Sequence, residues 1–408
     1  MNSEKMVSFL GLQMNGETWR NFRWDFTAAA LFSIFNVVFN QFYVPLALRH
    51  GASDFQVGLL TAAPAIGLLS SPLWASLAEN RDPKPFVVIP NFFARMLVVF
   101  PAIFPNPWVF VGAALLFHLL MGIQAPTYAS VMTRIYPAAL RGRLMGNVRV
   151  IMGLLMIPLA YLVGLWIDHA GSSGPLLIAS VTGVCSILAL NRVKTLTDFV
   201  PSKVKQRTTF VQQLRLVKQS PLLIMFLAAT TVSGFGNMLA SPLYSIIQVS
   251  KLQLTDLEIG YIRVAYYACL LVAYLVMGWV IDRFSPRVAL SFGMAFYMLP
   301  PLLYSLIGTY PAVLLAGGIQ GMGDAIWDIG CMAYVFKIAK GREGVVFGLH
   351  LMLFGVRGTI GPLLSTSLIH SVSMEAILIS AALCCVAGFL IFTLARGSEG
   401  QALSQSEA

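Results

Sequence analysis

The feature that most constrains this chain is a series of twelve apolar stretches, each close to the ~20 residues that an α-helix needs to cross a lipid bilayer. The stretches are continuous and lack the alternation of barrel strands, so we expect helices. The AVILMFWYC set makes up 57% of the chain and charged residues only 11%, which excludes a soluble domain of this size. We therefore predict an all-α membrane protein with twelve transmembrane helices. The predicted spans are Trp24–Leu48, Val57–Leu77, Phe86–Phe104, Trp108–Ser130, Leu144–Ile167, Leu176–Leu190, Leu222–Ile247, Ile259–Ile281, Val288–Ile307, Ala312–Phe336, Val345–Ile369 and Ala376–Leu394.

The distribution of positive charge predicts the orientation of these helices. Of the 27 Lys and Arg residues, 21 fall on the side of the N-terminus, two (Arg49 and Lys251) on the opposite side and four within spans. Cytoplasmic loops carry the excess of Lys and Arg in membrane proteins, so both termini are expected in the cytoplasm. The expected location is the cell membrane, plasma or inner, with many passes through the bilayer. The net charge of +10 is then an orientation signal, and no nucleic-acid partner is expected.

The sequence repeats itself at an offset near 202 residues. "SDFQVG" at Ser53–Gly58 matches "TDLEIG" at Thr255–Gly260, and both read as a capping box at a helix start. The repeat predicts two six-helix bundles at 1–195 and 219–396, a cytoplasmic linker at 196–218 and a cytoplasmic tail at 397–408. Because six is an even number, both halves enter the membrane from the same side. They are therefore parallel repeats related by a pseudo-twofold axis along the membrane normal.

A basic turn follows the second span of each half. The second half reads Gly278, Asp282, Arg283 and Arg287, whereas the first half has Glu79 in place of Asp and retains only Arg81 and Lys84. This turn resembles the Gly-x3-Asp-Arg-x-Gly-Arg-Arg/Lys signature of the major facilitator superfamily. Placed in a doubled twelve-span chain, the resemblance implies the major facilitator fold, transport by alternating access and a functional monomer.

The resemblance also implies a role for this turn as a cytoplasmic gate. A carboxylate at a helix end can accept hydrogen bonds from the exposed N–H groups that begin another helix. In the family such a contact links the two halves in one conformation. Asp282 would face the start of the fifth span near 142–143, and Glu79 the start of the eleventh near 341–342. The alternative is a solvated turn that only anchors topology.

Two departures weaken one subclass of the family, the proton-coupled drug exporters. His118 stands where these exporters often carry Arg in the fourth span, although Gly122 is retained. Their Gly-Pro signature is also missing from the fifth span. His118 is equally well explained as a packing histidine or as a group that binds a proton or substrate.

The stretch "GGIQGMGDAIWDIG" at 317–330 places two carboxylates inside an apolar run. Gln320, Asp324 and Asp328 recur every four residues and so form one stripe on a helix. Charges in hydrocarbon cost at least ~2.5–3.5 kcal/mol each, so they normally face a cavity or one another. A carboxyl group that binds and releases a proton in a gated cavity would couple transport to a proton gradient. The alternative is a structural salt-bridge cluster with Arg263 and Arg357 of the same half.

A second set of polar residues lies on the first span of each half. Asn36 and Asn40 in the first half correspond to Asn237 and Ser241 in the second, which continues with Tyr244. In the family, the first and fourth helices of each bundle line the central path, so these groups are expected to contact a polar solute. The alternative is hydrogen bonding between helices at ~0.6 kcal/mol per pair.

These observations favour a secondary active transporter for a small polar or amphipathic solute, with protons as a further partner and the lipid bilayer around it. A lipid or drug exporter of the same fold is the alternative. "GMGD" at Gly321–Asp324 matches intramembrane aspartyl proteases, but the Tyr-Asp pair that they require is missing, so an enzyme is only a remote alternative. No metal-binding, nucleophile or phosphate-loop motif is present, and no cofactor is expected.

Overall fold

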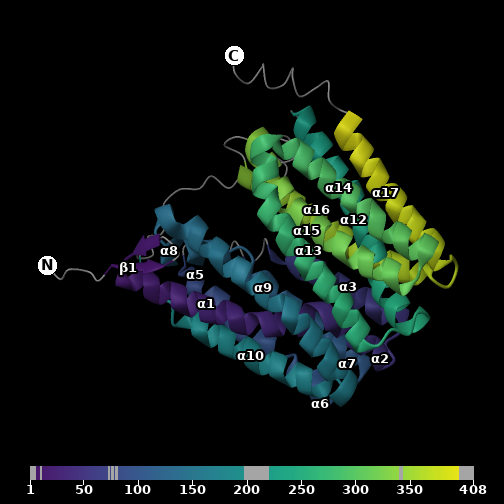
Figure 1. Ribbon diagram of the computed structural model, residues 1–408, viewed down its shortest axis with the longest axis horizontal. Coiled ribbons are helices and arrows are strands. Elements are labelled where there is room, and N and C mark those ends of the chain that lie inside the picture. Colours follow the sequence, from purple (N-terminus) through teal and green to yellow (C-terminus); the bar gives the residue numbers. More distant parts are fainter. Residues whose placement is uncertain are drawn as a thin grey trace. The chain divides into compact units, whose positions relative to one another are not determined.

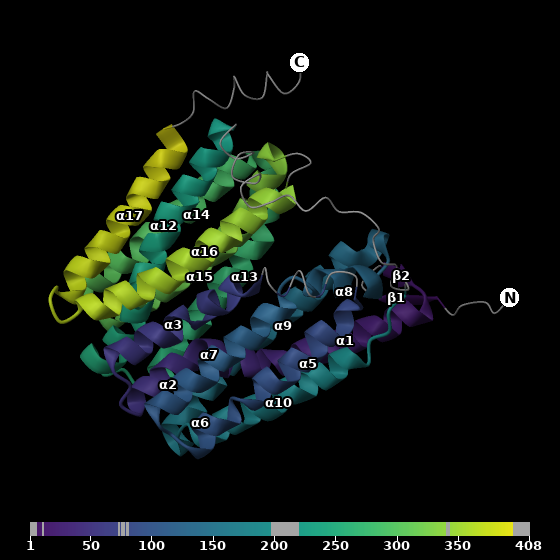
Figure 2. The ribbon, with the colours of Figure 1, turned by 180° about the vertical axis from the view of Figure 1, so that it is seen from behind.

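The computed structural model describes residues 6–9, 12–71, 74, 78, 81–196, 220–339 and 343–394 (Figures 1 and 2). The chain forms two compact units. Met1–Ala52 and Ile66–Lys203 make up the first unit, and Ser53–Ala65 and Val204–Ala408 the second. The predicted bundle, linker and tail boundaries remain predictions, and positions 197–219 and 395–408 lie outside the described residues.

The first unit begins with a short antiparallel hairpin and continues with helices. In the hairpin, Val7 pairs with Met14 and Phe9 with Leu12. Helix α1 neighbours α9 and α10, and α5 neighbours α7 and α10. The elements are β1 (Val7–Phe9), β2 (Leu12–Met14), α1 (Gly16–Asn36), η1 (Val37–Phe42), α2 (Tyr43–Arg49), α5 (Pro83–Met96), α6 (Val99–Ile103), α7 (Pro107–Gln124), α8 (Tyr128–Ile135), α9 (Ala138–Ala170) and α10 (Ser173–Asn191).

The second unit repeats the same pattern of neighbours. Its first helix packs on its last, α12 on α17, as α1 does on α10, and α14 lies between α15 and α17, as α5 lies between α7 and α10. Both ribbon views show α12, α14 and α17 side by side (Figures 1 and 2). The elements are α12 (Pro221–Ile246), η2 (Ile247–Lys251), α13 (Asp256–Arg283), α14 (Pro286–Leu302), η3 (Leu303–Ile307), α15 (Tyr310–Ile338), α16 (Glu343–Leu368) and α17 (Met374–Leu394).

Within the described residues, each predicted span is helical over most of its length, which confirms the all-α membrane fold class. Ten helical stretches among these residues are long and apolar enough to cross a membrane. The two predicted spans outside this set are α15, which carries both aspartates, and the span of α3 (Asp54–Leu69), whose described helix has only 16 residues. The count of twelve is therefore not confirmed by length and composition alone.

The helix starts follow the local sequence signals. Thr255 and Glu258 form the predicted capping box of α13, with both reciprocal hydrogen bonds present. Ser53 and Gln56 form its counterpart before α3, where the Ser53 amide donates to Gln56 Oε1 at 2.8 Å. Both predicted boxes are confirmed.

Two buried polar side chains in the first turns of α1, Asn21 and Asp25, bond to other elements of the first unit. Asn21 Nδ2 donates to the carbonyl oxygens of Ile135 and Lys194, and its Oδ1 accepts from the Lys194 amide. Asp25 accepts a hydrogen bond of 2.7 Å from the Tyr136 hydroxyl. These bonds tie the start of α1 to the ends of α8 and α10, and satisfy polar groups that burial would otherwise penalise.

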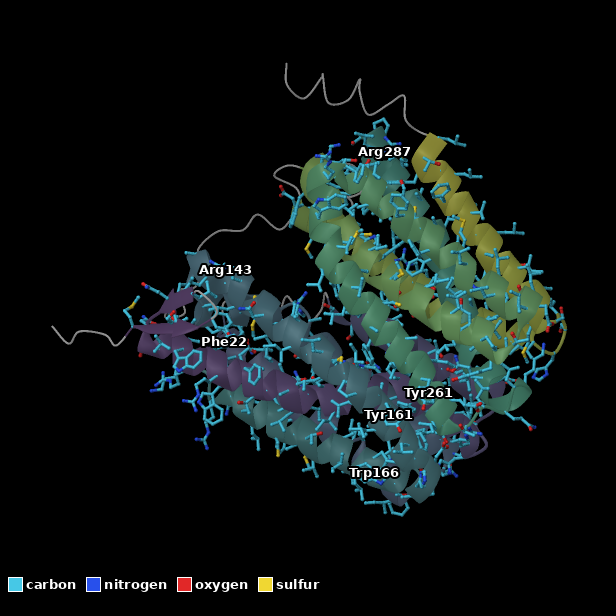
Figure 3. The ribbon with its side chains drawn as sticks, viewed as in Figure 1. Phe22, Arg143, Tyr161, Trp166, Tyr261 and Arg287 are labelled. Atoms are coloured by element: carbon cyan, nitrogen blue, oxygen red, sulfur yellow. The ribbon has the colours of Figure 1, made fainter. Side chains whose placement is uncertain are left out.

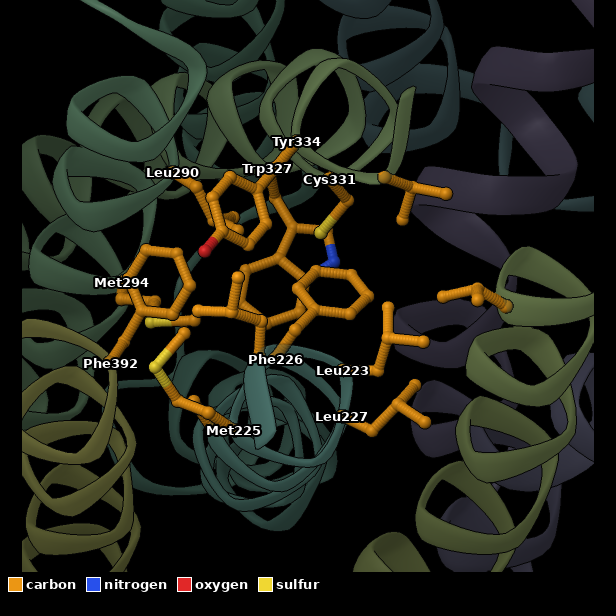
Figure 4. Packing of buried hydrophobic residues seen from close by; sticks show 14 of the residues in the cluster. Leu223, Met225, Phe226, Leu227, Leu290, Met294, Trp327, Cys331, Tyr334 and Phe392 are labelled. Atoms are coloured by element: carbon orange, nitrogen blue, oxygen red, sulfur yellow. The ribbon is translucent and has the colours of Figure 1, made fainter. Parts of the chain in front are cut away.

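The apolar core of the second unit lies between α12, α14, α15 and α17. Figure 4 shows Trp327, Cys331 and Tyr334 of α15 packed around Phe226 of α12. The Tyr334 ring also meets Phe392 of α17 edge-on, with centroids 5.1 Å apart. This packing fixes α12, α14 and α15, which carry most of the polar groups described next.

The start of α3 packs within the second unit, against α16. A Cβ on Gly58 would overlap the Thr366 side chain, and one on Gly358 would lie 2.7 Å from Ala65 Cβ. Asp54 Oδ2 lies 3.8 Å from His370 Nε2. Glycine on both helices allows this close approach of backbones.

Candidate functional site

Asp324 lies in a cage of hydrogen-bond donors from three helices of the second unit. The Tyr266 hydroxyl of α13 donates to Oδ2 at 2.7 Å, and the Tyr297 hydroxyl of α14 donates to Oδ1 at 2.8 Å. Gln320 Nε2, one turn earlier on α15, donates to Oδ1 at 3.0 Å. Hydrogen bonds to a carboxylate are stronger than bonds between neutral groups, so this cage stabilises a charge inside an apolar bundle.

Gln320 extends the cage to a fourth helix. Its Nε2 also donates to Asn237 Oδ1 of α12 at 3.2 Å. Gln320 Oε1 is buried and has no hydrogen-bond partner in the described part of the chain. The structure thus brings together three of the sequence-predicted residues, Asn237, Gln320 and Asp324, and leaves one acceptor open beside them.

Glycines on α15 explain why Tyr266 reaches Asp324. A Cβ on Gly321 would overlap the Tyr266 carbonyl, and one on Gly317 would come within 2.6 Å of Ile262 Cγ2. Without these side chains α13 and α15 approach backbone to backbone, as small residues permit in membrane helices.

A second polar group surrounds Arg263, one turn before Tyr266 on α13. Its Nη2 donates to Gln248 Oε1 at 3.3 Å, and Gln248 Nε2 donates to the Tyr304 hydroxyl at 2.5 Å. Gln248 and Tyr304 lie in η2 and η3, two π-helical turns of a kind that is frequent at functional sites. The Tyr304 ring stacks on Tyr244 with centroids 4.5 Å apart.

One face of α12 and η2 connects the two polar groups. Asn237, Ser241, Tyr244 and Gln248 follow at intervals of four, three and four residues, which is the spacing of one helical face. Asn237 and Gln248 are buried, and Ser241 and Tyr244 are partly buried. The polar stripe on this helix therefore runs from the Asp324 cage to the group around Arg263.

Asp328 lies apart from the cage, although it is one turn from Asp324. Its side chain is exposed and accepts a hydrogen bond of 3.1 Å from the Tyr274 hydroxyl. Because Tyr274 is two turns beyond Tyr266 on α13, the two aspartates contact different parts of that helix. The predicted stripe of three residues therefore divides into a partly buried pair and an exposed carboxylate.

The alternative of a salt-bridge cluster is not supported. Within the described residues, neither Arg263 nor Arg357 forms an ion pair with Asp324 or Asp328. Arg357 is instead 3% exposed and donates to the Thr230 carbonyl. Its guanidinium lies 5.5 Å from the Trp327 ring centroid. This arrangement is typical of a packed cation–π contact.

The predicted polar residues of the first unit do not form a comparable cluster. Asn36 is partly buried, whereas Asn40, which lies in the π-helical turn η1, is exposed. His118 of α7 packs between aromatic rings, with centroids 5.8 Å from Phe39 and 5.0 Å from Phe117. Their expected contact with a solute remains a prediction.

The last basic residue of each gate motif caps a helix within its own unit. Lys84 Nζ donates to the carbonyl oxygens of Asn191 and Val193 at the end of α10, at 2.8 and 2.9 Å. Arg287 Nη2 donates to the Phe392 carbonyl at the end of α17 at 2.8 Å. Figure 3 shows Arg287 at this end of the second unit. Both cations satisfy carbonyls that a helix C-terminus leaves without partners.

The positions of the other residues of the gate motif do not test the predicted latch. Gly278 and Arg283 are exposed on α13, and Arg81 is exposed before α5. Asp282 lies in α13, whereas Glu79 and positions 341–342 lie outside the described residues. The latch expected for Asp282 and Glu79 therefore remains a prediction.

Sequence reasoning missed the tyrosines and Gln248. Tyr266, Tyr297 and Tyr304 were hidden in apolar runs, where a tyrosine is ordinarily a packing residue. A usable signal existed on α13, since Arg263, Tyr266 and Tyr274 recur at near-helical spacing on one face. A buried carboxylate also requires donors, and neighbouring helices had to supply them.

Comparison with known sequences points to one family. The sequence profile of the Major Facilitator Superfamily matches residues 26–232 and again 226–408. The fosmidomycin resistance protein of Escherichia coli (strain K12) is 26% identical over 127 residues. That alignment spans only 31% of each chain.

Two solved structures share the fold. A mutant of the nucleoside transporter NupG superposes with a TM-score of 0.73 at 10% identity, covering 92% of this chain and 99% of that one. The POT family transporter PepTSo superposes with a TM-score of 0.73 at 11% identity, covering 94% and 99%. With the family profile matching both halves, this chain belongs to the Major Facilitator Superfamily of membrane transporters.

Proposed function

We propose that this transporter moves a small polar or amphipathic solute by alternating access and couples the movement to protons through Asp324. The observation that carries the proposal is the Asp324 cage, in which one partly buried carboxylate accepts from Tyr266, Tyr297 and Gln320. Among the described residues no cation pairs with this carboxylate. A carboxylate kept in a membrane helix under these conditions is a natural site for reversible protonation.

Protonation of Asp324 would rearrange its donors. A carboxylic acid must donate one hydrogen bond, so one of the three donors has to turn and accept. A tyrosine hydroxyl can do so by rotation. Gln320 can do so by turning its amide, because its Oε1 has no partner in the described residues. That turn would break its bond to Asn237 and so change the contact between α15 and α12.

The finer features of the proposal follow from the sequence. We propose both termini in the cytoplasm, a location in the cell membrane and function as a monomer without catalytic chemistry. The latch at Asp282 and Glu79 would hold one conformation of the cycle. Asn36, Asn40 and His118 would contribute to the path from the first unit.

The deciding experiment is transport by purified protein in proteoliposomes with an imposed pH gradient. Candidate solutes are first screened with the wild type, and Asp324→Asn is then compared with Asp328→Asn. We expect Asp324→Asn to lose at least about tenfold of the gradient-driven uptake, the effect of a missing ~1.4 kcal/mol or more. Asp328→Asn should lose less, since its carboxylate is exposed with Tyr274 beside it.

Asp168→Asn is the matched control, because it removes an exposed carboxylate at the end of α9. Solute exchange without a gradient should persist in Asp324→Asn, which separates coupling from folding. If Asp324→Asn and Asp328→Asn both keep full gradient-driven uptake, the proton role is wrong and a uniporter remains.

Export of a drug is the second candidate. The relative in Escherichia coli is named for resistance to fosmidomycin, and its similarity to part of this chain favours this reading over a lipid exporter. Reduced accumulation of a drug by cells that express the wild type, lost in Asp324→Asn, would support it.

A further inference from the structure

Arg263 is a cation without a counter-ion. Within the described part of the chain, no carboxylate lies within ion-pair distance of its guanidinium, and its hydrogen-bond partner is the neutral side chain of Gln248. Its Nε is buried with no hydrogen-bond partner among the described residues. An arginine in a membrane helix is costly, and ordinarily pairs with an anion or faces a water-filled space.

The groups around Arg263 leave further polar atoms open. The Tyr244 hydroxyl is buried and, like Arg263 Nε, finds no partner in the described residues. Tyr244 stacks on Tyr304, which Gln248 ties to Arg263. Gln320 of α15 bonds to Asn237, which lies farther along the same face of α12. Its Oε1 is a buried acceptor that no described residue satisfies. Buried polar atoms are nearly always paired in native proteins, so three such atoms, on α12, α13 and α15, point to a missing ligand.

Arg357 provides the contrast within the same unit. It is 3% exposed, sealed against Gly234 and the Trp327 and Phe354 rings, and bonded to the Thr230 carbonyl. Arg263 is only partly buried and carries no such aromatic sandwich in the described residues. The Nε atoms of both arginines lack a partner in the described residues, and Arg263 is the more exposed of the two.

We propose that Arg263 binds the anionic group of the transported solute, a small carboxylate or phosphate that also carries a hydroxyl or amino group. The proposal rests on the transport function proposed above and names its substrate class. The guanidinium fork matches the two oxygens of such an anion. The Tyr244 hydroxyl donates to a further oxygen of the anion. The hydroxyl or amino group of the solute donates to Gln320 Oε1.

The test measures thermal unfolding of the full-length protein in detergent, followed by the fluorescence of its seven tryptophans. The probes are pairs at equal millimolar concentration: glycolate and glycolamide, 3-hydroxybutyrate and 3-hydroxybutyramide, glycerol 3-phosphate and glycerol. Butyrate tests the need for the hydroxyl group. We expect at least one hydroxylated anion to raise the unfolding temperature, with its neutral counterpart and the anion without a hydroxyl group having less effect.

Variants assign the effect to the site. Arg263→Gln and Tyr244→Phe should each weaken binding of that anion, Arg263→Gln by about tenfold or more, because a charged hydrogen-bonding partner is lost. Arg263→Lys keeps the charge but lacks the two parallel N–H donors of a guanidinium. Its affinity for the anion should therefore lie between those of the wild type and Arg263→Gln. Arg149→Gln, which removes an exposed arginine of α9, is the control. If Arg263→Gln fails to fold, Arg263→Lys and Tyr244→Phe decide the question.

The proposal is overturned if no anion of the panel stabilises the wild type, if neutral members stabilise equally, or if the Arg263 and Tyr244 variants bind the anion as the wild type does. A second source of anionic groups is the lipid headgroup. Stabilisation by phosphatidylglycerol alone, lost in Arg263→Gln, would assign Arg263 to a lipid and also overturn the proposal.

The two proposals fail separately. Binding of an anion that depends on Arg263, without gradient-driven uptake, would contradict proton coupling and leave the substrate class standing. Uptake that depends on Asp324 but is unaffected by Arg263→Gln would contradict only the substrate class.

Discussion

The two units repeat one pattern of helix neighbours but use matching positions differently. Tyr43 and Tyr244 correspond in the repeat, yet the Tyr43 hydroxyl donates to the Phe110 carbonyl at 3.0 Å, whereas the Tyr244 hydroxyl has no partner in the described residues. At the offset of 202, Gln320 and Asp324 correspond to His118 and Gly122. At these positions the first unit therefore pairs the tyrosine hydroxyl and carries a histidine and a glycine in place of the glutamine and the carboxylate.

The gate motifs show the opposite behaviour. Their signature is degraded in the first half, yet Lys84 and Arg287 cap the last helix of their units in the same way. A structural role is thus retained in both units, while the polar cluster around Asp324 and Arg263 belongs to the second. The two halves of the repeat thus share the helix cap and differ in the polar cluster.

The largest expected effect on stability comes from the close contact of α13 and α15 in the second unit. Gly321→Ala would drive a methyl group into the Tyr266 carbonyl. Because the clash is with backbone, forcing the helices apart should cost about 3 kcal/mol or more and disrupt the Asp324 cage. Thermal unfolding and gradient-driven uptake should both fall. Gly112→Ala on α7, where a Cβ meets nothing within 4 Å, is the control. Equal stability of the two variants would contradict the close packing.

The second prediction concerns the matched helix caps. Arg287→Ala removes a buried charged donor that also lies 5.6 Å from the Phe392 ring, and should cost about 1.5–3 kcal/mol. Lys84→Ala removes a partly exposed donor and should cost about 0.3–1 kcal/mol. The measurement is thermal unfolding of each purified variant. A larger loss of stability in Lys84→Ala than in Arg287→Ala would contradict the roles given to these two contacts.

The third prediction separates the matched tyrosines. Tyr43→Phe removes the additional hydrogen bond from this hydroxyl to the Phe110 carbonyl of α7 and should cost about 1 kcal/mol of stability. Tyr244→Phe removes a hydroxyl with no partner among the described residues, so its unfolding temperature without ligand should stay close to that of the wild type. Its effect should appear instead in solute binding. A lower unfolding temperature of Tyr244→Phe without ligand, with unchanged solute binding, would give Tyr244 a structural role instead.

Much of the fold could be predicted because long apolar runs identify membrane helices. The positions of most spans and both capping boxes follow from local sequence, and the structure confirms them. The predicted boundaries of the bundles remain predictions, and the structure groups Ser53–Ala65 with the second unit. That grouping depends on packing against α16, which local patterns do not encode.

The candidate site was predictable only in part. Helical spacing brought Gln320 to Asp324, but the same reasoning joined Asp328 to them, and packing against α13 separates it. Spacing alone did not show that Asn40 lies in a π-helical turn and is exposed, whereas Asn36 is partly buried. The tyrosine donors were missed because a tyrosine side chain is apolar except for its terminal hydroxyl group.

The glycine face of α15 limits how this transporter can change its specificity. Where α13 and α15 touch through backbone, no side chain can be exchanged to widen or reshape that wall. In the proposed site, new solutes would be accommodated from α12, where Ser241 and Tyr244 can be replaced. Directed evolution of substrate range should therefore accumulate substitutions on α12 and leave the wall behind Tyr266 untouched.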